Sequence, residues 1–210
     1  MIIIPGQLEI ISCDEWGAQP PARELEVREY RGRGAVFHQT GGQNFPPNAI
    51  PATQRKMAIM LAKNTQSFHM GPERNWSDSG QHFTNSIDGI LLEGRHGSIK
   101  AAMSGKIVIG AHCADSDANP PVNKNDSFGL ESEGLFQTHQ MNDKQMAALV
   151  RLFAWLSIVA DFDSSMIIGH RASGISTNCP GDWLFGQTQA IRKAVHNKKL
   201  EFIKLGVKKP

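Results

Sequence analysis

The stretch M-I-I-G-H-R-A-S-G-I-S-T-N-C-P-G, at residues 166–181, constrains this chain more than any other. Its first residues form a short apolar run that predicts a buried strand, and Gly169 ends that run. His170 therefore lies at the end of a strand, where a sheet can hold its side chain in a fixed direction. A loop rich in serine and glycine then closes at Cys179, which Pro180 favours in an extended conformation. An imidazole and a thiolate at these positions form a donor set that zinc prefers.

A catalytic zinc site needs a third protein ligand and one open position. Residues 34–38, G-A-V-F-H, form a second apolar run that ends at a histidine, and a turn follows at residues 39–42. The pattern mirrors the run before His170, so we expect both histidines to point from neighbouring strand ends into one cleft. His38, His170 and Cys179 are therefore the best candidate metal ligands.

Two alternatives to this ligand set remain open on spacing alone. Cys179 can be a small buried residue while the histidines are satisfied by hydrogen bonds. Other histidines compete as ligands, namely His69, His82, His96 and His112. The remaining two, His139 and His196, lie in polar segments, where we expect exposed side chains.

Hydrophobic periodicity predicts three helices outside this region. The first covers residues 51–69 and opens on a proline. Its apolar residues share one face, namely Met57, Met60, Leu61 and Phe68. Asn142 and Gln145 resemble a capping box that begins a helix of about 18 residues. The last helix covers residues 184–197.

Further strands are indicated by turn signals and by alternation. The Asp88-Gly89 pair predicts a β-hairpin over residues 82–93. Residues 106–110 read as another short strand, and residues 114–126 read as a loop rich in proline, asparagine and aspartate.

The segment S-F-G-L-E-S-E alternates with period two, so Phe128 and Leu130 face one way while Glu131 and Glu133 face the other. For Glu133 we expect a solvated sheet face. For Glu131 a solvated face and a functional site are equally favoured, because Gly129 lets a ligand or a neighbouring backbone approach closely.

Composition and charge narrow the class of protein. The chain has 210 residues, of which 40% are hydrophobic and 20% charged, as in a soluble domain of ordinary size. A formal charge of +2 is too small to indicate a nucleic-acid partner. Lysines crowd the C-terminus, where a solvated tail is the favoured interpretation. If Cys179 binds a metal, Cys13 and Cys113 remain as free thiols or as one bridge, with free thiols favoured.

The N-terminal segment M-I-I-I-P-G-Q-L has no basic region, and a proline interrupts its apolar run, so we do not expect a signal peptide. No segment approaches the ~20 apolar residues of a membrane span. We therefore expect a chain made in the cytoplasm that acts on cell wall after release or delivery, or on soluble fragments in the cytoplasm.

Taken together, the motifs resemble the zinc-dependent N-acetylmuramoyl-L-alanine amidases of the type 2 amidase and peptidoglycan recognition protein family. The matching segments follow in the family's order over about residues 12–186: S-C-D-E-W-G-A, V-F-H-Q-T-G-G, Q-S-F-H-M, W-S-D-S-G-Q-H-F, D-G-I-L-L-E-G-R-H, G-A-H-C, S-F-G-L-E-S-E-G, I-I-G-H-R and T-N-C-P-G-D. The resemblance implies an α/β fold with a central mixed β-sheet flanked by helices. We expect an N-terminal arm at residues 1–32, a catalytic domain at residues 33–197 and a basic tail at residues 198–210.

The same resemblance implies roles for individual residues. It matches His38, His170 and Cys179 to the zinc ligands, Thr177 to a residue that contacts the oxyanion, and Glu131 to a general base. Expected substrate contacts are Gln81, Arg95, His96 and His112. The main departure is Gln81, because many family members have a catalytic tyrosine there and a glutamine cannot act as a general base.

The resemblance thus implies a monomeric hydrolase that cleaves the amide between N-acetylmuramic acid and L-alanine in peptidoglycan. Three alternatives stay open: a module that only binds peptidoglycan, a cytoplasmic enzyme that recycles muropeptides, and a phage lysin or secreted effector. The complete His/His/Cys set favours an enzyme over a binding module, because binding alone does not require it.

Overall fold

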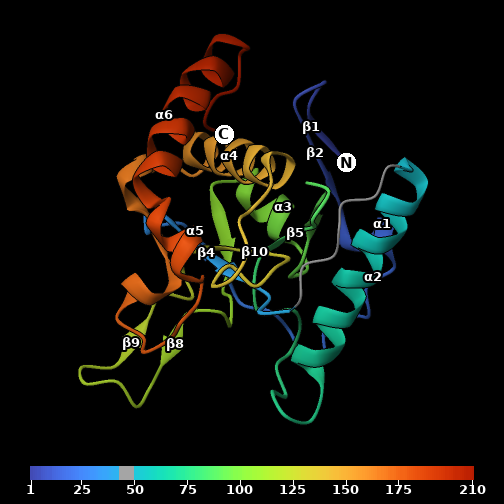
Figure 1. Ribbon diagram of the computed structural model, residues 1–210, viewed down its shortest axis with the longest axis vertical. Coiled ribbons are helices and arrows are strands. Elements are labelled where there is room, and N and C mark those ends of the chain that lie inside the picture. The colour runs from blue at the N-terminus through green and yellow to red at the C-terminus, as the bar shows by residue number, and fades with distance from the viewer. Residues whose placement is uncertain (43–49) are drawn as a thin grey trace.

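The computed structural model describes residues 1–42 and 50–210, and their centre is a seven-stranded sheet of order β1-β2-β6-β5-β10-β4-β11 (Figure 1). Its strands are Ile2–Ile4 (β1), Leu8–Ile11 (β2), Ala35–Gln39 (β4), Phe83–Asn85 (β5), Leu91–Glu93 (β6), Phe128–Ser132 (β10) and Ile167–Gly169 (β11). The β1–β2 and β5–β6 pairs are antiparallel, whereas β2–β6, β5–β10, β10–β4 and β4–β11 are parallel. The predicted mixed sheet is confirmed.

Two small sheets of the described chain lie outside the central one. Val27–Glu29 (β3) pairs with Lys106–Val108 (β7), and Ala114–Asp115 (β8) pairs with Val122–Asn123 (β9). The strand expected at residues 106–110 therefore exists but does not extend the central sheet. The expected loop at residues 114–126 contains a short hairpin.

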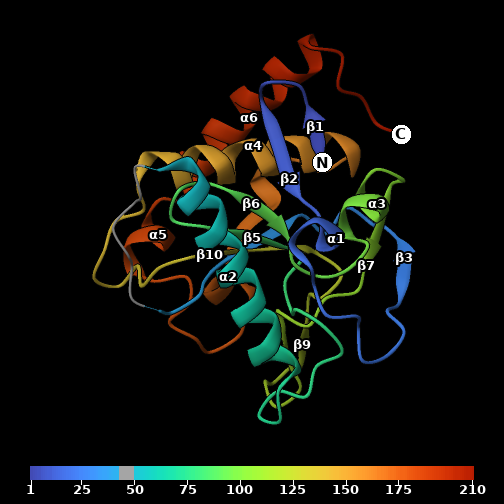
Figure 2. The same cartoon turned by 90° about the vertical axis from the view of Figure 1, so that its right-hand side faces the viewer.

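Helices cover both faces of the sheet (Figures 1 and 2). They are Cys13–Trp16 (α1), Pro51–Met70 (α2), Ser98–Ala102 (α3), Asp143–Val159 (α4), Asp182–Gly186 (α5) and Thr188–Lys204 (α6), with short 3₁₀ helices at Ser164–Met166 and His170–Ser173. Successive residues of β6 show the two layers, because Leu91 belongs to the core shared with α4 and α6, whereas Leu92 packs in a separate cluster with α2.

The long helix α4 forms as its sequence predicts. The Asn142 side chain accepts a hydrogen bond from Gln145 N at 3.1 Å. The reciprocal bond of a capping box is not formed between these two residues, because Gln145 Oε1 accepts from the side-chain amide of Asn142 at 3.4 Å and not from its backbone N–H. The Gln145 amide donates to Glu133 O at 2.9 Å. Leu149 and Phe153 are buried on the face that packs against the sheet.

The predicted apolar face of α2 is not its buried face. Met60 is 52% exposed and Phe68 is 49% exposed. The helix instead buries a side made of small and polar residues, namely Ala58, Ala62, Gln66 and His69. Small residues let α2 approach Leu92 closely, and the Gln66 side chain hydrogen-bonds to Asp78 at 2.8 Å.

Both ends of the chain are more ordered than expected. The last helix was expected at residues 184–197, but α5 and α6 are separate helices and α6 continues to Lys204. Residues 1–32, which we expected as an N-terminal arm, contribute β1 and β2 to the central sheet. Trp16 anchors this arm, since its indole is buried and donates to Glu93 O at 2.8 Å. The domain boundaries themselves stay a prediction.

The structure also settles the state of the two remaining cysteines. Cys13 and Cys113 are both free and buried, in agreement with the favoured alternative. Within residues 1–42 and 50–210, no helix combines the length and the apolar character needed to cross a membrane.

Candidate metal centre

The three expected ligands meet at one end of the sheet. His38 lies near the end of β4, and His170 directly follows β11, the parallel neighbour of β4. Parallel strands end at the same edge of a sheet, so both imidazoles reach one place. Ligand atoms of His38, His170 and Cys179 lie within 4.8 Å of one another. Among the described residues no other group of three such side chains has this proximity.

The backbones of β4 and β11 approach each other closely at Gly34. Gly34 precedes β4 and has a φ of +76°. A Cβ at this position would lie 2.2 Å from Met166 O, immediately before β11. Glycine therefore lets the strand of His38 lie against the strand of His170.

The Cys179 loop is fixed by its own hydrogen bonds. Cys179 Sγ lies 3.7 Å from His38 Nδ1 and accepts a hydrogen bond from Gln39 N at 3.4 Å. Arg171 N donates to Cys179 O at 3.0 Å. The Arg171 guanidinium donates to Asp182 at 2.6 Å and to Asn178 O at 2.5 Å, which closes the loop beside the sulfur. Sequence reasoning missed this role of Arg171, although its position next to His170 is a signal for it.

Hydrogen-bond roles fix the tautomer of His38. Ser127 O can only accept, so His112 Nε2 donates to it at 3.0 Å. A neutral His112 then accepts at Nδ1, and the 3.0 Å contact with His38 Nε2 requires His38 to donate. His38 Nδ1, on the side of Cys179, is thereby left with a free lone pair for a metal.

Two glycines make room for His112. A Cβ at Gly129 would lie 2.8 Å from the His112 ring, and a Cβ at Gly110 would lie 2.6 Å from it. The sequence indicated a close approach at Gly129, and the group that approaches is this imidazole.

Replacing His112 with leucine should weaken zinc binding about 10- to 100-fold, because it removes the hydrogen bond that orients His38. His112→Asn should restore part of the affinity, since its amide oxygen can accept from His38 Nε2. Competition with a chromophoric chelator measures both constants. Equal affinities of the leucine variant and the parent would contradict the orienting role.

The shifted pKa values of His38 and His170 suit the binding of a divalent cation. Burial and neighbouring histidines hold the pKa of His38 well below its ordinary value, and burial lowers that of His170 to about 4. Both imidazoles are therefore neutral, as ligands must be. Burial raises the pKa of the Cys179 thiol to about 12, so a bound metal must displace its proton. His170 Nε2 is buried and has no hydrogen-bond partner in the described chain.

Glu131 lies beside the cluster. It pairs in register with His38 on the adjacent parallel strand, which places both side chains on one face of the sheet. Glu131 Oε2 is buried without a hydrogen-bond partner among the described residues. Burial raises the pKa of this carboxyl to about 7, and its charge contributes to the raised pKa of Cys179. A carboxyl with this pKa can exchange a proton near neutral pH.

Glu133 does not face solvent as expected. Its side chain is buried, and its Oε2 accepts a hydrogen bond from Ile87 N at 2.7 Å. The predicted alternation holds, but the turn between β5 and β6 covers this end of the sheet face. Glu133 therefore secures the hairpin turn.

Thr177 contacts the cluster through Cys179, whereas Gln81 is linked to it only through Thr84. The Thr177 hydroxyl accepts a hydrogen bond from Cys179 N at 3.1 Å, and its own proton remains to be donated. Gln81 is buried and donates to Thr84 Oγ1 at 3.0 Å, whereas its Oε1 lacks a partner in the described chain. Thr84 pairs in register with Glu131, so Gln81 is linked to the face that carries this carboxyl.

Arg95 and His96 belong to a separate buried polar cluster. Arg95 donates to Ser79 O at 2.8 Å, and His96 Nδ1 lies 2.8 Å from Asp78 Oδ2. Their expected contacts with substrate stay a prediction, as do those of Gln81 and His112. Arg95 is almost fully buried, which leaves little of it for a ligand.

The other histidines are accounted for. His82 uses both ring nitrogens, at 2.6 Å from Val108 O and 2.9 Å from Gly129 N, and His69 Nδ1 accepts from Gly80 N. His139 and His196 are exposed, as expected. The donor set of two neutral imidazoles and one thiol fits a zinc ion.

Comparisons with known proteins agree with this geometry. Residues 28–182 match the family model described as N-acetylmuramoyl-L-alanine amidase. The chain is 30% identical over 173 residues to peptidoglycan-recognition protein SC2 of Drosophila simulans, covering 82% of this chain and 80% of that protein.

Solved structures share the fold at lower identity. Peptidoglycan recognition protein LE, solved in complex with tracheal cytotoxin, superposes with a TM-score of 0.64 at 23% identity, covering 86% of this chain and 92% of that one. The N-acetylmuramoyl-L-alanine amidase LysC from Clostridium intestinale URNW gives 0.62 at 22% identity, with 87% and 96% covered.

Proposed function

Because this chain belongs to the N-acetylmuramoyl-L-alanine amidase family, we propose that it hydrolyses the amide between N-acetylmuramic acid and L-alanine of peptidoglycan or its fragments. The observation that carries the proposal is the convergence of His38, His170 and Cys179 within 4.8 Å, beside a buried carboxyl on the adjacent strand. A module that only binds peptidoglycan does not require this combination.

Zinc held by these three ligands would supply a Lewis acid and a water whose pKa is lowered to about 7. Glu131 accepts the proton of the attacking water at its carboxylate and later donates it to the departing alanine nitrogen. The Thr177 hydroxyl donates to the oxyanion that develops on the substrate carbonyl. His112 keeps His38 in the tautomer that leaves Nδ1 free.

A second candidate function is recognition of peptidoglycan without cleavage. Gln81 favours it, because a glutamine stands where many family members have a catalytic tyrosine. The similar proteins include both recognition proteins and amidases, so membership of the family does not decide between the two functions.

The decisive experiment measures release of free L-alanine N-termini from purified peptidoglycan, with and without a chelator, and zinc content on the same sample. The amidase proposal expects release that the chelator abolishes, at about one zinc per chain. Tight binding of peptidoglycan by the zinc-loaded protein, with no release, would overturn cleavage and support recognition. Intact wall and soluble muropeptides, used in parallel, show which form is the substrate.

A further inference from the structure

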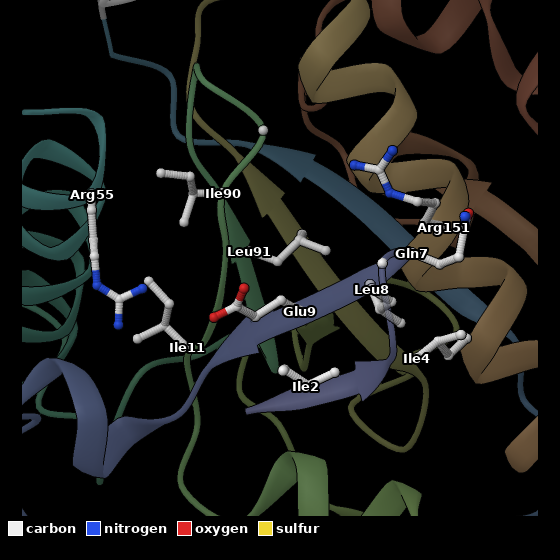
Figure 3. A pocket seen from close by; sticks show the side chains of 12 residues that line it. Ile2, Ile4, Gln7, Leu8, Glu9, Ile11, Arg55, Ile90, Leu91 and Arg151 are labelled. Atoms are coloured by element: carbon white, nitrogen blue, oxygen red, sulfur yellow. The ribbon is translucent and has the colours of Figure 1, made fainter. Parts of the chain in front are cut away.

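A pocket of about 580 Å³ lies at the β1–β2 edge of the central sheet (Figure 3). It is formed over β2 and β6, whereas the cluster lies at β4 and β11, at the other end of the strand order. Helix α2 borders it on one side and α4 on the other (Figure 3). The pocket is therefore separate from the candidate catalytic site.

The pocket has the character of a small-molecule site. Its volume lies within the roughly 300–1,000 Å³ of typical ligand pockets, which are mostly apolar with a few polar groups. Half of the lining residues carry apolar side chains, namely Ile2, Ile4, Leu8, Ile11, Ile90 and Leu91. Ile2 is 68% exposed, so this end of the sheet presents an uncovered apolar surface.

Two arginines reach the pocket from opposite sides, Arg55 from α2 and Arg151 from α4 (Figure 3). The one acidic residue of the lining, Glu9, points toward the Arg55 side (Figure 3). Arg151 therefore faces the apolar lining with no carboxylate beside it.

Arg151 is half-buried and makes no hydrogen bond or ion pair within residues 1–42 and 50–210. Loss of hydration is the one cause that lowers its pKa, and no neighbouring carboxylate opposes that effect. A partly desolvated guanidinium without a protein partner is left to water alone, and an anion in the pocket would form a charge-assisted pair with it.

We propose that this pocket binds a free amphipathic carboxylate, such as an unbranched fatty acid, with its head on Arg151 and its chain against the partly exposed Ile90, above the nearly buried Leu8 and Leu91. A neutral apolar ligand would leave Arg151 unpaired. A cationic amphiphile would meet two positive side chains and one negative one. This site does not depend on the proposed amidase activity.

Calorimetric titration with decanoate, kept below its micelle concentration, tests the proposal. We expect one site per chain, with decanoate bound at least tenfold more tightly than decanol. Shortening the acid should weaken binding by roughly fourfold per methylene removed from the pocket. Arg151→Gln should weaken decanoate about 10- to 100-fold and leave decanol unchanged.

Arg55→Gln is the matched control, because it removes the same charge from the same pocket on the side where Glu9 points. We expect it to change decanoate affinity by less than about threefold. Ile90→Trp should fill the pocket and weaken acid and alcohol alike. The proposal is overturned if decanoate does not bind, if decanol or decyltrimethylammonium binds equally well, if both arginine variants lose affinity equally, or if binding requires anionic vesicles.

Discussion

Replacing Cys179 with alanine should abolish both amide hydrolysis and the pH dependence of zinc binding. The thiol keeps its proton far above neutral pH in the metal-free protein, because burial raises its pKa to about 12. Zinc must displace that proton, so the apparent association constant should rise about tenfold per pH unit. His170, with a pKa of about 4, contributes no such slope above pH 7, and neither does His38, whose pKa is lowered as well.

The measurement is zinc affinity by chelator competition between pH 7.5 and 9, where Glu131 is mostly ionised. The parent protein should show a slope of about one proton per zinc, and Cys179→Ala a slope near zero. At pH 8 the zinc affinity of Cys179→Ala should fall by more than about 10- to 100-fold. That range is typical for the loss of a residue that only hydrogen-bonds to a ligand, and the loss of a ligand itself costs more. Cys13→Ala is the control, since Cys13 is also a free buried thiol but lies beside Glu93, away from the cluster. An unchanged slope in Cys179→Ala would exclude the sulfur as a ligand.

The clustering of His38, His170 and Cys179 was predictable because each residue is marked locally. Short apolar runs end at His38 and His170, and a proline follows Cys179. Strands of this kind are buried on both faces, and parallel neighbours bring their ends to one edge. The structure places both histidines on the adjacent strands β4 and β11.

The surroundings of the site depend on contacts between distant segments, which local patterns do not encode. His112 follows a glycine and an alanine in the G-A-H-C motif, and nothing there indicates that its ring rests on Gly129 or bonds to His38. Glu133 shows what the alternation of apolar and polar residues cannot predict. The period of two places its side chain on the correct face of the sheet, but it does not reveal that a hairpin turn covers this face.

Two other differences between the predicted and the observed structure also arise from contacts between distant segments. The face of α2 with the larger apolar residues was not the buried one, because the small side of the helix approaches the sheet more closely. The pocket near Arg151 requires β1 and β2 at the sheet edge, within a segment that we expected only as an N-terminal arm.

Glu131→Gln should lower turnover about 10²- to 10⁴-fold, the usual contribution of a positioned general base. Zinc affinity should stay close to that of the parent, because Glu131 is not among the ligands. Glu133→Gln is the matched control two residues along the chain, directly after β10. An amide oxygen there can still accept from Ile87 N, so we expect turnover to change less than about threefold.

Glu131→Gln should make the metal-free protein more stable than the parent above pH 7, although it lowers turnover. Burial raises the pKa of Glu131 from an ordinary 4.5 to about 7 in the folded state. The folded protein therefore holds this proton more tightly than the unfolded chain, and the stability it confers is lost as the pH rises from 4.5 through 7. By pH 8 the ionised carboxylate should cost about 3 kcal/mol, which glutamine does not incur. Urea unfolding at pH 5 and pH 8 should show a smaller pH-dependent loss for Glu131→Gln than for the parent. Lost turnover with this change in stability identifies a buried, ionisable base, whereas near-normal turnover would remove Glu131 from the mechanism.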